Sequence, residues 1–192
     1  MKRSVRTLSA IAGIALIASS LSGCITINES SGPNGKMMNP DEHHGSNHSM
    51  SITDKKSFAE AMIPHHQQAV DISEFALTNT TNSEVVAIAK KIIGEQAPEI
   101  ENMTVWLEGD SADYSMMMDG MLSRAQLAEL EAAKDDEFDA LYVQYMVQHH
   151  EGAIAMAADA LGIDDPELSE FANEIIVNQS AEIEELMSLL NK

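Results

Sequence analysis

Two short stretches of the sequence combine a methionine with a pair of adjacent histidines at the same spacing. They are residues 62–66 (MIPHH) and residues 146–150 (MVQHH). Imidazole binds copper, zinc, iron and nickel, whereas a thioether favours Cu(I). The repeated combination therefore predicts a metal site, with copper as the preferred ion. The candidate imidazole ligands are His65, His66, His149 and His150.

Helical spacing places both histidine pairs on apolar stripes. An α-helix turns by about 100° per residue, so His65 and His66 lie about 60° and about 40° to either side of Met62. The second pair has the same relation to Met146, and Met156 continues its stripe. We therefore expect all of these side chains to point toward the protein interior, with the three methionines as additional candidate ligands.

Two other segments place amide and carboxyl side chains on apolar stripes. Gln96 and Glu99 lie on one of these stripes, and Gln179 and Glu182 lie on the matching one. A buried imidazole or carboxyl group needs polar partners. These four side chains are therefore candidate metal ligands or hydrogen-bond partners of the histidines.

The inward histidines also have an explanation without a metal, namely a hydrogen-bond network with Glu and Gln that fixes the register of the core. A ferritin-type di-iron site is disfavoured, because such sites use a Glu three residues before the His. The residues at those positions here are Met62, Ile63, Met146 and Val147.

A further run of thioethers lies between the two histidine pairs, at Met116–Met118 and Met121. These side chains are candidates for metal binding or for packing. Methionine is a flexible gap-filler, and the chain has only four Phe, three Tyr and one Trp with which to fill a core.

The segments that carry these residues form an internal repeat. Met146 follows Met62 by 84 positions, and Gln179 follows Gln96 by 83. The apolar periodicity is helical, without strand-like alternation. The sequence therefore predicts an all-α four-helix bundle, built from two repeated helical hairpins with a short connecting helix. The expected helices cover residues 53–78, 83–108, 124–133, 136–161 and 166–190.

Local signals set the ends of these helices. Residues 81–84 and 123–126 fit capping boxes, and Asp165-Pro166 fits an N-cap followed by a proline at the first helical position. Gly109 and Gly162 follow helical stretches and fit helix ends.

Residues 1–23 are expected to be a lipoprotein signal peptide. Basic residues precede an apolar stretch of about eleven residues, which is too short to span a bilayer comfortably. The stretch ends in LSGC, which resembles a bacterial lipobox whose cysteine, here Cys24, is lipidated. The alternative is an ordinary signal or an uncleaved anchor with a chance cysteine. We expect an extracytoplasmic protein, anchored to the cell membrane through lipid at Cys24.

Residues 24–52 are rich in Ser, Gly, Asn and Pro, which is typical of a flexible tether, and residues 53–192 form the folded domain. Three His and three Met lie in the tether, within residues 37–50. Short His-rich tracts often bind metals, although a polar linker is the alternative for this one.

The charge and the cysteine count exclude several classes of protein. The formal net charge is −20, so the chain repels phosphate backbones and nucleic-acid binding is not expected. A single cysteine excludes an internal disulfide framework, thiolate zinc sites and iron–sulfur clusters.

The histidine and glutamine motifs in residues 58–69, 96–107, 146–157 and 179–183 resemble those of the DUF305 family, and the resemblance covers about residues 53–190. It implies a ferritin-like four-helix fold. The lipobox and the acidic chain are similar to secreted or lipoprotein members from actinobacteria. Because some relatives are periplasmic copper-binding proteins, the resemblance also implies a copper role. The second copy departs from the first at Gln148 and Leu186, so the two halves need not bind a metal equally.

Three hypotheses for function follow. The first is an envelope lipoprotein that binds a metal ion, most simply copper, for sequestration or transfer. The second is a structural or protein-interaction lipoprotein without a metal, in which the histidines form core hydrogen bonds and the protein partner is unknown. The third is a redox metalloenzyme, for which the sequence offers no nucleophile with a base, no phosphate loop and no cofactor motif.

Overall fold

The computed structural model describes residues 51–190, and this part of the chain contains α-helices and no strand. Each predicted helix is present, with observed ends within about two residues of the prediction. The predicted signal peptide, Cys24 and nearly all of the tether lie outside the described residues. The helices are α1 (Lys55–Asn79), α2 (Ser83–Trp106), α3 (Arg124–Ala132), α4 (Asp135–Ala160) and α5 (Pro166–Leu189).

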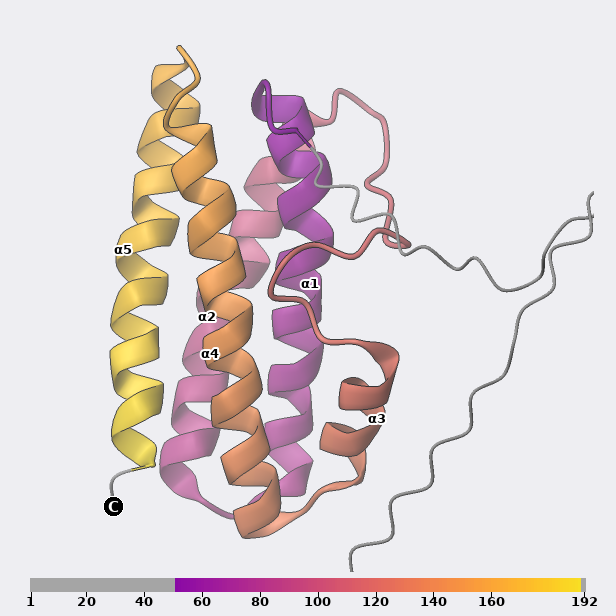
Figure 1. Ribbon diagram of the computed structural model, residues 1–192, viewed down its shortest axis with the longest axis vertical. Helices are drawn as coiled ribbons and strands as arrows, with labels where there is room; N and C mark the ends of the chain where they lie inside the picture. The colour runs from indigo at the N-terminus through magenta and orange to yellow at the C-terminus, as the bar shows by residue number, and fades with distance from the viewer. Residues whose placement is uncertain (1–50, 191–192) are drawn as a thin grey trace, which may run out of the picture. The chain divides into compact units, whose positions relative to one another are not determined.

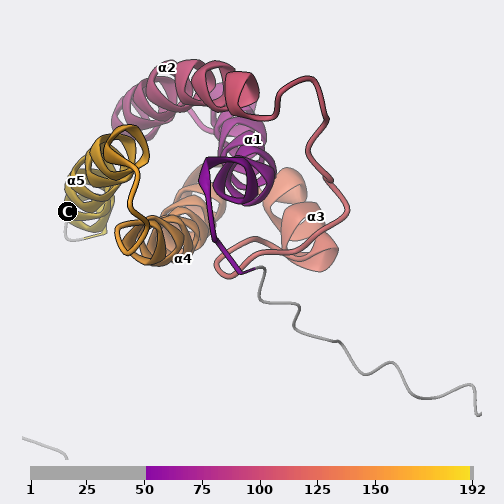
Figure 2. The ribbon, with the colours of Figure 1, turned by 90° about the horizontal axis from the view of Figure 1, so that it is seen from above.

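The four long helices form the predicted bundle from two hairpins (Figure 1). One hairpin is α1 with α2, and the other is α4 with α5; α1 packs against α4 between them. Seen from above, α3 lies outside the bundle beside α1 (Figure 2). In the described residues no helix is long and apolar enough to cross a membrane.

One of the two predicted capping boxes is present. Ser123 and Gln126 form the reciprocal box at the start of α3. The box predicted for residues 81–84 is wrong, because Asn82 caps α2 and its side chain accepts the Glu84 amide hydrogen at 3.1 Å. Glu84 is therefore at the second helical position, where it cannot complete a box.

The apolar core is divided into two clusters, one toward each end of the bundle. Every long helix contributes to both clusters and carries polar residues between its two contributions. One cluster includes Ile72, Ile88, Phe138, Met146 and Leu186. The other includes Phe58, Met62, Met103, Ala157 and Leu168. We call the buried polar layer between them the polar belt; it comprises His65, His66, Gln96, His149, His150, Gln179 and Glu182.

The connection between α2 and α3 packs closely against α4 beside this belt. A Cβ atom on Gly152 would lie 2.1 Å from the Asp119 carbonyl oxygen. Gly120, at the other side of the contact, has a φ of +85°, a conformation that glycine adopts without strain. The loop thus reaches the backbone of α4 only because both residues lack a side chain.

Replacing Gly152 by alanine should destabilise the fold by about 1–3 kcal/mol or more, since backbone atoms must move to admit the new methyl group. Gly94→Ala on α2 is the matched control, because a Cβ there meets nothing within 4 Å. That substitution should stabilise the fold by up to about 1 kcal/mol through helix propensity. Urea unfolding measures both values, and equal effects of the two variants would contradict the close packing.

Candidate metal centre

The structure places all four candidate histidines in the buried interior, as their helical spacing predicts. Gln96, Gln179 and Glu182 are also buried, and the Glu99 side chain is 16% exposed. The thioethers are spread along the bundle. Met62 and Met146 are fully buried in opposite apolar clusters, whereas Met156 is half-buried beside the cluster that contains Met62.

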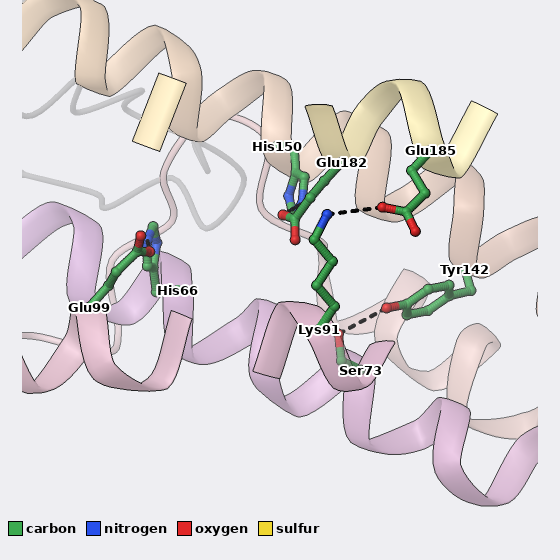
Figure 3. Close-up of polar contacts among 8 residues, drawn as sticks. All are labelled: His66, Ser73, Lys91, Glu99, Tyr142, His150, Glu182 and Glu185. Atoms are coloured by element: carbon green, nitrogen blue, oxygen red, sulfur yellow. Dashed lines mark hydrogen bonds and ion pairs between the residues drawn. The ribbon is translucent and has the colours of Figure 1, made fainter. Parts of the chain in front are cut away.

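Each hairpin contains one histidine–glutamate pair. His66 on α1 contacts Glu99 on α2 at 2.9 Å between Nε2 and Oε2, and His150 on α4 contacts Glu182 on α5 at 2.8 Å (Figure 3). A carboxylate accepts hydrogen bonds, so in each pair the imidazole donates through Nε2. The lone pair of each imidazole is therefore on Nδ1.

The other two histidines meet where α1 faces α4. The rings of His65 and His149 have centroids 3.8 Å apart and planes inclined by 43°. His65 donates through Nε2 to the Asp119 carbonyl oxygen at 3.2 Å, which leaves its Nδ1 as the lone-pair nitrogen. Neither ring nitrogen of His149 has a hydrogen-bond partner.

The belt contains an unusual set of buried polar atoms without hydrogen-bond partners. They are Nδ1 of all four histidines, Nε2 of His149, both amide atoms of Gln96 and of Gln179, and Oε1 of Glu182. Buried polar groups in folded proteins are nearly always satisfied. Outside the belt, the one other described side-chain atom of this kind is Asp139 Oδ1, and the buried hydroxyls of Ser73 and Tyr142 form a 3.0 Å hydrogen bond (Figure 3). The unmatched atoms of the belt are therefore the groups that a bound ion or an ordered water molecule would satisfy.

Burial keeps three of the belt imidazoles, those of His65, His149 and His150, in the neutral form. Removal from water lowers the pKa of His65 and of His150 to about 3 and holds the pKa of His149 well below its usual value. The neighbouring imidazoles add to each of these shifts. A neutral imidazole is the form that binds a metal ion, so these three imidazoles need no deprotonation at neutral or mildly acidic pH.

These shifts predict a loss of stability in acid. The unfolded chain protonates His65 and His150 near pH 6.5, whereas the folded chain protonates them only near pH 3. Between these values the unfolded state binds more protons, so stability falls as the pH falls. Each of these histidines should lower the folding equilibrium constant by about tenfold per pH unit once the pH is well below 6.5.

Urea unfolding at pH 7.5, 5.5 and 4.5 checks this prediction. Burial raises the pKa of Glu182 and of Glu95, so these carboxyls favour the folded state at low pH and offset part of the loss. Stability that is unchanged between pH 7.5 and 4.5 would contradict the neutral, buried state of the histidines.

Three groups around the belt were not among the residues predicted from the sequence. Glu95 lies close enough to Glu182 for each carboxyl to affect the pKa of the other. Lys91, which forms an ion pair with Glu185 at 2.9 Å, lies beside Glu182 (Figure 3). The third group is the backbone carbonyl of Asp119, for which no side-chain pattern gives a signal. Glu95 is one helical turn before Glu99, and that spacing was the available signal.

The donors of the belt suit a soft metal ion better than a hard one. Within residues 51–190, no group of three or more His, Cys, Asp and Glu side chains is arranged to hold a metal ion. A site in the belt would therefore combine imidazole nitrogens with other donors, such as the thioethers of Met62 and Met146. Mixed imidazole and thioether donors favour Cu(I).

Comparison with known proteins shows the family to which this chain belongs. The sequence matches the family described as "Domain of unknown function (DUF305)" over residues 55–190, so the chain belongs to the DUF305 family. Its fold is the helical bundle of solved members of that family. No curated protein matches the sequence.

Three solved structures are similar to nearly the whole described part. A putative secreted DUF305 protein from Streptomyces coelicolor is 28% identical, with a TM-score of 0.66 over 72% of this chain and 93% of that one. A DUF305 fragment from Deinococcus radiodurans is 26% identical, with a TM-score of 0.68 over 73% and 97%. CopM in its Cu(I)-bound form is 30% identical, with a TM-score of 0.62 over 73% and 97%. CopM has also been solved in Cu(II)-bound and Ag-bound forms.

Proposed function

We propose that this protein binds monovalent copper in the polar belt, for sequestration or transfer. The observation that carries the proposal is the set of unpartnered Nδ1 atoms on His65, His66, His149 and His150. Three of these imidazoles are held through Nε2 by a carboxylate or a carbonyl group. Histidines that bind metals typically donate their other ring N–H to such a partner, which fixes the orientation of the ring.

We propose different roles for the candidate residues, based on this arrangement. His65 and His149 are the proposed central ligands, because their rings adjoin and no carboxylate contacts either of them. Glu99 and Glu182 are proposed to orient His66 and His150 rather than to bind the metal. Met62 and Met146 are the proposed thioether donors from the two sides of the belt. Met156, Gln96 and Gln179 are the remaining candidates.

The structural alternative accounts for the belt less well. A hydrogen-bond network that served only to fix the register of the helices would satisfy its members, because each unsatisfied buried group costs about 1–3 kcal/mol. The amides of Gln96 and Gln179 have no partner at either atom. The copper-bound and silver-bound forms of CopM also support a metal ion as the missing partner.

Location and anchoring are part of the same proposal. The Streptomyces coelicolor relative is described as a secreted protein, and the basic and apolar start of this sequence favours export. We propose an extracytoplasmic lipoprotein, held at the cell membrane by lipid on Cys24, with residues 24–52 as its tether. Replacing Cys24 by alanine should release the protein from the membrane fraction.

Thermal unfolding in the presence of Ag(I) tests the metal proposal. Ag(I) has the charge and ligand preference of Cu(I) and does not oxidise in air. The test uses the full chain with the tether donors replaced by serine, which we call the tether-substituted chain. Those donors are Met37, Met38, His43, His44, His48 and Met50.

Ag(I) at about 100 times its Kd should stabilise the tether-substituted chain by about 2.7 kcal/mol and raise its melting temperature. The same concentration of Zn²⁺ should have a much smaller effect, since the belt lacks the convergent hard donors that Zn²⁺ prefers. A melting temperature that responds to neither ion would support the structural alternative and overturn the proposal.

A further inference from the structure

The loop at residues 116–121, which we call the methionine loop, presents thioethers at graded depths. Met117 is 56% exposed and Met118 is 9% exposed, while Met116 and Met121 are half-buried. Packing explains Met118, which is buried. It does not explain Met117, whose side chain is mostly in water. The loop therefore places thioether sulfurs, which are soft donors, at positions that range from the surface to the interior.

Hydrogen bonds hold this loop against both histidine-bearing helices. His65 on α1 donates to the Asp119 carbonyl oxygen at 3.2 Å, and Gln148 on α4 donates to the Gly120 carbonyl oxygen at 3.3 Å. Gln68 on α1 exchanges two hydrogen bonds, of 3.1 and 2.6 Å, with the backbone of Leu122. The loop is thus fixed directly beside the first of the proposed central ligands.

One thioether within the loop, that of Met121, is also held in place. The Met118 backbone N–H donates to the Met121 sulfur at 3.3 Å, which fixes the position of that thioether within the loop. The sulfur retains a second lone pair for a metal ion. No lysine or arginine occurs in residues 109–123, so a cation approaching this loop meets no positive side chain within it.

We propose that the methionine loop is a transfer site, which takes up monovalent copper at the surface and passes it to His65. This proposal rests on the proposed function of the belt. Transfer is a ligand exchange: a bond from Cu(I) to the His65 Nδ1 lone pair forms as a bond to a thioether breaks. The copper stays monovalent and no proton is released, because Nδ1 carries none. Thioethers bind Zn²⁺ weakly, so the loop also selects for soft ions at entry.

The rate of metal uptake distinguishes a transfer site from a storage site. The probe is Cu(I) delivered from bathocuproine disulfonate, a coloured chelator whose absorbance reports the transfer. The variant is Met116→Leu, Met117→Leu and Met121→Leu in the tether-substituted chain. Leucine keeps the approximate volume of methionine and removes the sulfur. Met187→Leu, at an exposed methionine on α5, is the matched control.

The loop variant should take up Cu(I) about tenfold more slowly or worse, while its equilibrium affinity stays within about twofold of the parent. The Met187→Leu control should match the parent in both quantities. An unchanged rate in the loop variant would overturn the transfer site. A fall in affinity equal to the fall in rate would also overturn it, because the loop would then be part of the equilibrium site.

Equilibrium binding of Cu(I) by the parent chain shows whether the transfer site fails alone or together with the belt site. If the parent binds Cu(I) at equilibrium and the loop variant is as fast, only the transfer site fails. If the parent itself binds no Cu(I), the belt proposal fails and the transfer site fails with it.

Discussion

Replacing His65 and His149 together by leucine should weaken Cu(I) binding by at least about a hundredfold. Loss of a single outer partner of a metal-binding histidine costs about 10–100-fold in affinity, and this change removes two proposed ligands. Leucine fills much of the same space, so the bundle should remain folded. Competition with a chromophoric Cu(I) chelator, in the tether-substituted chain, measures the effect.

The control for this experiment removes another polar contact from the same core. Tyr142 is buried and bonds to Ser73, within the apolar cluster that contains Met146. Tyr142→Phe should reduce stability by about 1–3 kcal/mol, because the Ser73 hydroxyl loses its partner, and should leave Cu(I) affinity unchanged. The belt proposal is wrong if the histidine variant keeps the parent affinity.

Replacing Gln96 and Gln179 by leucine should stabilise the metal-free protein. Both amides are buried and neither has a hydrogen-bond partner. Exchanging an unsatisfied buried amide for an apolar group of similar size removes its desolvation penalty, so we expect a gain of about 1–3 kcal/mol at each site. Urea unfolding of the metal-free chain gives the value.

Gln68 provides a control of the same residue type at a comparable depth. It is 9% exposed, and its amide makes two hydrogen bonds to Leu122. Gln68→Leu should therefore destabilise the protein by about 1–3 kcal/mol, since two backbone groups lose their partners. If the belt glutamines behave like Gln68, the belt is a satisfied network and the structural alternative is correct.

If the leucine variants at Gln96 and Gln179 gain stability while Gln68→Leu loses it, the belt lowers the stability of the metal-free fold. Such a cost is typical of functional sites, where local rules of stability are broken for a ligand. The protein would then gain stability from its metal ion rather than from its own hydrogen bonds. Loss of metal would favour local opening of the bundle around the belt.

The fold and the inward direction of the site residues could be predicted from the sequence, because helical periodicity converts spacing into direction. His65 and His66 are adjacent in the chain and straddle one stripe, so one of them faces α4 and the other faces α2. The repeat at offsets of 84 and 83 positions predicted two hairpins, and both are present.

The hydrogen bonds that hold the imidazoles could be predicted only in part. Facing stripes indicated Glu and Gln side chains as candidate partners of the histidines, but which residues pair, and through which nitrogen, depends on side-chain rotation. The contact of His65 with Asp119 joins positions 54 residues apart and uses a backbone carbonyl, which has no residue signature. The spacing of Glu95 one helical turn before Glu99 indicated a shared helix face, but its approach to Glu182 depends on the packing of α2 against α5.

The central claim is that the ring nitrogens now without partners bind a soft monovalent ion, and ¹⁵N NMR of the histidine rings tests it most directly. Ag(I) is added to the tether-substituted chain labelled at histidine. We expect the Nδ1 resonances of His65 and His149 to shift strongly, while Nε2 of His66 and of His150 remains protonated. Spectra in which no Nδ1 resonance of the belt responds to Ag(I) would contradict the claim.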